Sequence, residues 1–181
     1  MIYHLSLHTA GLIAGISLVL LAALALFFPA RNFLSQFPRS RGAGAIILTI
    51  DLAWSFWLLA TMEMGEFSNF RRPLLIIVPI GFFLVLRFAD EFLAVRALGI
   101  LFLLAAEPLL DAAFLRPEMS RLLVTVLAYL MIVAGLLWVT MPYLLRDQIA
   151  WSTKTAGAWR IVAGLTMIFG IAITACAVVA Y

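Results

Sequence analysis

Charged residues are scarce in this chain. They make up 12% of its 181 residues, whereas an ordinary soluble domain is roughly one quarter charged. Hydrophobic residues account for 66%, and the mean hydropathy is +1.15. A chain of this composition cannot cover a soluble fold with polar side chains, so the sequence predicts an integral membrane protein.

Cysteine, histidine and lysine are rarer still. The single cysteine, Cys176, falls in the last apolar run, so no intramolecular disulfide can form. His4 and His8 would share a helical face, but no third metal ligand is near them in the sequence. The only lysine, Lys154, falls in a loop, which disfavours a retinal-type pigment. The sequence also lacks a glycine-rich phosphate loop and a catalytic Ser/His/Asp set. We therefore expect no cofactor and no metal, and nothing points to an enzyme.

The basic residues are distributed unevenly over alternate loops. One set of loops carries eight of them: Arg31, Arg39, Arg41, Arg87, Arg96, Arg146, Lys154 and Arg160. The other set carries four: Arg71, Arg72, Arg116 and Arg121. Because cytoplasmic loops are enriched in Lys and Arg, we expect both termini to lie outside a bacterial-type inner membrane. The formal charge of +3 is then an orientation signal, and we expect no nucleic-acid partner.

Long apolar runs occupy most of the chain. A helix needs about 20 residues to cross about 30 Å of hydrocarbon, and no run shows the strict alternation of a membrane strand. The sequence therefore predicts a single all-α membrane domain. Its six predicted spans are 9–29, 43–62, 73–89, 91–114, 121–141 and 157–180. The first run follows no basic segment, so it is predicted to be a retained span rather than a cleaved signal.

The third predicted span is short, because the chain is apolar almost without interruption from residue 73 to 114. A turn at Asp90 and Glu91 would divide this stretch into two spans, with Arg87 reaching from the end of the first toward the membrane surface. One long kinked helix, giving five spans in total, is the alternative.

The sequence also predicts three helical hairpins of similar construction, at 9–62, 73–114 and 121–180. The second helix of each begins with an arginine three or four residues before a glycine. These pairs are Arg41 with Gly44, Arg96 with Gly99, and Arg160 with Gly164. An internal repeat would explain the pattern, and chance is the competing explanation. In both cases we expect the arginines to be interfacial anchors and the glycines to mark close helix contacts.

Two connecting segments, 30–38 and 143–151, have an amphipathic pattern. Phe33, Leu34 and Phe37 share one face of the first, and Leu145 and Ile149 share one face of the second. Such segments are typical of the membrane interface. The aromatic residues Tyr143, Trp151 and Trp159 fit the aromatic belt of the same region.

Four polar residues in the spans are candidate functional residues. Asp51 lies about nine residues into its span, and Ser55 follows one turn later on the same face. Glu107 precedes Pro108, and Asp111 follows one turn after Glu107. A carboxylate at mid-membrane costs on the order of 3 kcal/mol, so it needs a reason to be there. The acid is a hydrogen-bond donor between helices, part of a proton or cation pathway, or the partner of a cation on another subunit.

A chain with almost no mass outside the membrane must act through its helices. We expect a membrane subunit or scaffold that contacts lipids, other membrane proteins or further copies of itself. The alternative is a small proton- or cation-coupled transporter or channel that uses Asp51 and Glu107.

Overall fold

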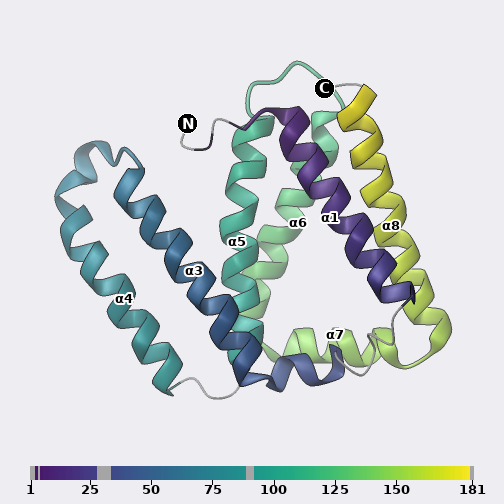
Figure 1. Ribbon diagram of the computed structural model, residues 1–181, viewed down its shortest axis with the longest axis horizontal. Helices are drawn as coiled ribbons and strands as arrows, with labels where there is room; N and C mark the ends of the chain where they lie inside the picture. Colours follow the sequence, from purple (N-terminus) through teal and green to yellow (C-terminus); the bar gives the residue numbers. More distant parts are fainter. Residues whose placement is uncertain (1–2, 4, 28–33, 89–91, 180–181) are drawn as a thin grey trace.

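The computed structural model describes residues 3, 5–27, 34–88 and 92–179, which form helices and contain no strand. Figure 1 shows the long helices standing side by side and a shorter helix crossing one end. The long helices are α1 (Leu7–Phe27), α3 (Arg41–Thr61), α4 (Arg71–Phe88), α5 (Leu93–Ala113), α6 (Arg121–Thr140) and α8 (Ala156–Val179). The shorter elements are η1 (Phe37–Arg39), η2 (Gly65–Phe70) and α7 (Tyr143–Thr153).

Six helices in the described part of the chain are long and apolar enough to cross a membrane, which confirms the predicted span number. The third of them combines η2 with α4, from Gly65 to Phe88. The five-span alternative is wrong, because α4 ends at Phe88 and α5 begins at Leu93 as a separate helix. The predicted turn residues, Asp90 and Glu91, lie outside the described residues.

Local chemistry sets several helix boundaries. Ser40 precedes α3, and its side chain accepts a hydrogen bond from the Ala43 N–H at 3.2 Å, as an N-cap residue does. Pro142 precedes the first residue of α7, where its missing N–H leaves no helical hydrogen bond unmade. Pro79 and Pro108 lie inside α4 and α5, where each removes one backbone hydrogen bond.

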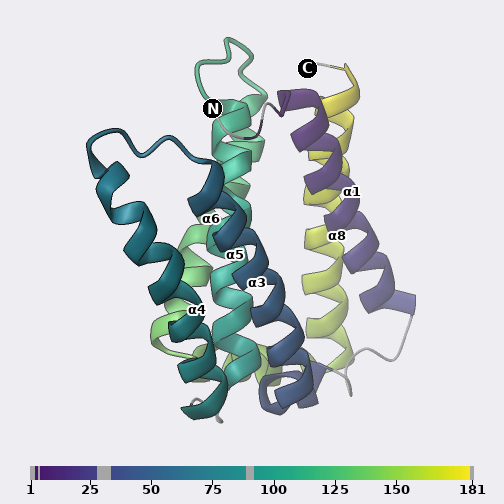
Figure 2. The same ribbon diagram turned by 60° about the vertical axis from the view of Figure 1, so that its left-hand side comes forward.

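The pairs of helices that pack extensively differ from the three predicted hairpins. Helix α1 packs along α8, α5 packs along α6, and α3 lies between α5 and α4. The two helices of each predicted hairpin, such as α1 and α3, are not among these pairs. Figure 2 shows α3 beside α4 and α1 beside α8, with the two pairs apart. The structure therefore does not show the arrangement predicted from the repeated arginine and glycine pattern.

Small residues spaced seven apart explain which helices pack. Gly99, Ala106 and Ala113 are all buried on α5, and the same spacing relates the buried Ala163, Gly170 and Ala177 of α8. A Cβ added to Gly135 of α6 would lie 2.7 Å from the Gly99 carbonyl oxygen. A Cβ added to Gly170 would lie 3.0 Å from the carbonyl oxygen of Gly15 on α1. Close backbone approach of this kind is a main source of helix association in membranes.

Helix α7 and the described part of the first amphipathic segment, residues 34–38, lie at the end of the bundle that is lower in Figure 1. Leu145 and Ile149 of α7 are buried in one cluster with Val95 of α5, and Leu34 and Phe37 pack against it. The predicted apolar faces are therefore confirmed, except at Phe33, which lies outside the described residues. The Trp159 Nε1–H donates a hydrogen bond to the Ala25 carbonyl oxygen at 2.8 Å and joins α8 to α1 near this end.

Candidate functional site

Asp51 is buried in the contact between α3 and α5. Only 2% of its surface is exposed, and it lies one turn beyond the buried Leu48, which packs with Leu93 and Ala97 of α5. Neither carboxyl oxygen has a hydrogen-bond partner among the residues that the structure describes. The free-energy cost of burying this carboxyl is therefore not offset by any described interaction.

Tyr3, which precedes α1, contacts the second half of α3. The Trp54 Nε1–H donates a hydrogen bond to the Tyr3 hydroxyl at 2.7 Å, and the Tyr3 ring packs against Trp57 with centroids 5.6 Å apart. Burial raises the pKa of the Tyr3 phenol, the Trp54 hydrogen bond lowers it, and the nearby Glu107 carboxylate raises it further. Tyr3 therefore joins the second half of α3 to the acidic face of α5.

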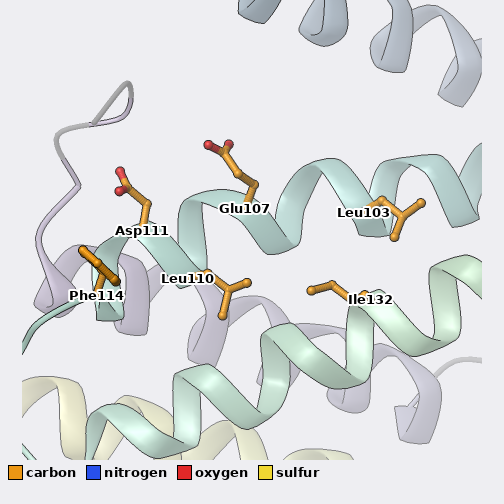
Figure 3. A pocket seen from close by; sticks show the side chains of 6 residues that line it. All are labelled: Leu103, Glu107, Leu110, Asp111, Phe114 and Ile132. Carbon is orange, nitrogen blue, oxygen red and sulfur yellow. The ribbon is translucent and has the colours of Figure 1, made fainter. Parts of the chain in front are cut away.

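Glu107 and Asp111 lie one turn apart on α5, and Figure 3 shows both side chains pointing away from α6. Glu107 is exposed and Asp111 is half-buried. They line an open pocket of about 450 Å³, whose other lining residues are Leu103, Leu110, Phe114 and Ile132. The two acids thus share one surface near the end of the bundle that lies opposite α7.

Asp51 and Glu107 lie in different surroundings. Asp51 is enclosed between two helices and accepts no described hydrogen bond, whereas Glu107 is exposed beside Asp111 and Tyr3. Ser55 is half-buried one turn after Asp51. The structure therefore brings Glu107 and Asp111 into one site and leaves Asp51 in a separate buried position.

Arg41, Arg96 and Arg160 lie in the first turns of α3, α5 and α8, at the α7 end of the bundle. All three side chains are exposed, and the Arg41 Nη2 donates a hydrogen bond to the Leu86 carbonyl oxygen at 3.4 Å. This placement suits interfacial anchors. Their anchoring role stays a prediction.

The three glycines singled out from the sequence have different surroundings. A Cβ on Gly44 would lie 2.7 Å from the Ala94 nitrogen, and one on Gly99 would lie 2.9 Å from the Gly135 carbonyl oxygen. A Cβ added to Gly164 would meet no atom within 4 Å, so the structure does not have the close contact that the sequence predicts there. The contact residue is Ala163, one position earlier, which is buried. The spacing from Arg160 points to Gly164 and so misses Ala163. The seven-residue spacing from Gly170 leads to Ala163 directly.

The expectation that the chain binds no metal stays a prediction. His8 is exposed, and His4 lies outside the described residues. Within the ranges that the structure describes, no three His, Cys, Asp or Glu residues are grouped as metal ligands. Comparison of the chain with protein-family models, with curated proteins and with solved structures gives no match.

Proposed function

We propose that this protein is a membrane subunit or scaffold that binds another membrane protein through α4 and the acidic face of α5. The observation that supports the proposal is the position of α4. None of its residues is buried, and its extensive contacts are with α3 and the adjoining η2 alone. A spanning helix held by one long neighbour leaves most of its surface for other molecules in the membrane.

The surface of α4 suits a helical partner. Its exposed side chains include Ile76, Ile80 and Phe83, and an added Cβ on Gly81 would meet no atom within 4 Å. A glycine with open space beside it, among large apolar side chains, lets the backbone of a second helix approach closely. Lipid chains can also cover such a surface, but the open space at Gly81 gives them no specific contact.

The acidic face of α5 gives the partner a polar anchor. Glu107 lies six residues before the end of α5, or roughly 9 Å inside it at 1.5 Å per residue. A carboxylate at this depth favours a partner that supplies a cation or a hydrogen-bond donor. We therefore infer that the partner is a membrane helix with Lys, Arg or a hydroxyl side chain near its outer end.

Site-specific photo-crosslinking in the native membrane tests the proposal. A photoreactive amino acid replaces Ile76 on α4 or, as the control, Ile161 on α8; both positions are 63% exposed. We expect a discrete protein adduct from position 76 that weakens in Glu107→Gln/Asp111→Asn, and lipid-sized products alone from position 161. Equal products from the two positions would contradict a partner surface on α4.

Proton- or cation-coupled transport is the second candidate, and the burial of Asp51 favours it. An ionisable side chain inside a span with no described partner is a common feature of proton pathways. Purified protein in vesicles should then show proton flux that is lost in Asp51→Asn. The control is Asp147→Asn, at an exposed position where Asp147 pairs with Arg146 at 2.9 Å. The absence of flux from the protein alone would remove this candidate.

A further inference from the structure

A second cavity, of about 420 Å³, lies where α1 and α3 fail to pack against each other. Its walls come from α1, α5 and α6, and Trp54 of α3 and Tyr3 close its outer end. Ile13, Ser17 and Leu21 line it along α1. Ala105 on α5 and Met131 on α6 line the opposite walls. The cavity therefore occupies the position that a directly packed first hairpin would have filled.

The length and chemistry of this cavity suit a hydrocarbon chain. Its lining on α1 runs from Ala10 to Leu21, a rise of roughly 16 Å at 1.5 Å per residue. The Ser17 hydroxyl donates to the Ala14 carbonyl oxygen at 2.8 Å, so it needs no further acceptor. The volume is roughly three times that of an engineered apolar cavity that holds one benzene molecule. Between Ser17 and Leu21 the lining offers too few polar partners to order water.

The polar groups of the cavity are gathered at one end. Tyr3 precedes α1, and its hydroxyl accepts the hydrogen bond from Trp54 at the outer rim. Tyr and Trp side chains with one apolar and one polar end are typical of the level where lipid headgroups begin. An amphiphile in the cavity would therefore place its polar part at Tyr3 and its hydrocarbon beside Ser17 and Leu21.

We propose that this cavity binds one acyl chain of a membrane phospholipid, with the glycerol end at Tyr3 and Trp54. A partner helix does not fit there, because a helix with side chains is about 10–12 Å wide. To admit one, α1 would have to leave α5 and α6, yet Ala14, Leu127 and Ala113 of these helices pack in one core cluster. The proposal does not rest on the proposed function, because α4 contributes no residue to this cavity.

Native mass spectrometry of the full-length protein tests the site. Protein purified in mild detergent and stripped of lipid is mixed with palmitoyl-oleoyl phosphatidylglycerol, and retained lipids are counted. Two variants fill the cavity from opposite walls, Ser17→Phe from α1 and Ala105→Phe from α5. Thr49→Phe is the matched control for Ser17→Phe. Thr49 is also exposed, and its hydroxyl bonds its own helix at Ala45, but it does not line the cavity.

Wild-type protein and Thr49→Phe should each retain one phospholipid that both filled variants lack. A phenyl ring that displaces about two methylene groups should weaken binding roughly tenfold. Ser17 is exposed, so its replacement disturbs no core contact, and a loss of lipid there reports on the cavity. Retention of the lipid by either filled variant, or its loss in Thr49→Phe, would overturn the proposal.

Discussion

At the scale of single residues, the sequence identifies the buried acid but not its environment. Asp51 is conspicuous because its neighbours along the chain are apolar, and its helical face also carries Gly44 and Leu48. Whether a partner meets its carboxyl depends on how α3 sits against α5, which no local pattern encodes. The same limit applies to Glu107, whose exposed position depends on the face that α5 turns toward α6.

Replacement of Asp51 should reveal whether its carboxyl is paired. Because no described group bonds it, Asp51→Leu should raise the free energy of unfolding by about 1–3 kcal/mol, the usual cost of a buried unsatisfied group. Asp51→Asn should leave that free energy nearly unchanged, since the amide is equally polar. Thermal unfolding in detergent, followed by circular dichroism, measures both. A leucine variant less stable than wild type would mean that the carboxyl has a partner.

The Tyr3 hydroxyl should stabilise the outer half of the bundle. Tyr3→Phe removes the acceptor for the Trp54 Nε1–H and should lower the free energy of unfolding by about 1 kcal/mol. Tyr129→Phe is the control, since Tyr129 is 58% exposed on α6. Thermal unfolding in detergent compares Tyr3→Phe with Tyr129→Phe. Equal changes in the free energy of unfolding would show that the hydrogen bond between Tyr3 and Trp54 does not stabilise the protein.

At the scale of helices, the number of spans and the apolar faces of the amphipathic segments could be predicted, while the pairing of helices could not. Hydropathy and length define each span, and the apolar faces at Leu145 and Ile149 follow from simple helical periodicity. The predicted hairpins pair helices that are adjacent in the chain, because the second helix of each begins with an arginine such as Arg41. The structure instead follows the seven-residue spacing of small residues that includes Gly99 and Gly170, a pattern that is already present in the sequence.

Leucine at the contact glycines should separate the helices there. Gly135→Leu and Gly170→Leu should each lower the free energy of unfolding by about 1–3 kcal/mol, because nearby backbone atoms cannot retreat without moving a helix. Gly164→Leu should have little effect, because no atom lies within 4 Å of its added Cβ. Melting temperatures in one detergent compare the three variants. Similar losses in all three would show that the close contacts at Gly135 and Gly170 do not account for the effect.

At the scale of the whole molecule, the structure separates the connections into two groups. The start of α1, η2, the α5–α6 connection and the end of α8 lie at one end, and α7 lies at the other (Figure 1). This alternation agrees with the two alternating sets of loops that the sequence predicts. Which end faces the cytoplasm follows from the excess of basic residues alone and stays a prediction.

Cysteine labelling in sealed cells tests the orientation. In a Cys176→Ala background, cysteines at Ser6 or Ser68 should react with an impermeant reagent, and a cysteine at Thr155 should react only after permeabilisation. All three positions are exposed, so a difference in labelling reports the side of the membrane. Labelling at Thr155 in intact cells would reverse the predicted orientation.

The pairing of α1 with α8 also has a consequence for biosynthesis. Helix α1 ends at Phe27 and α8 ends at Val179, so about 150 residues are made between one partner and the other. At 5–20 residues per second, α1 waits roughly 8–30 s in the bilayer with Gly15 uncovered. During that interval its small-residue face is available to chaperones or to the wrong helix. Synthesis of α8 therefore serves as the step that closes the bundle, and a ribosome stalled before Ala156 would leave α1 without its partner helix.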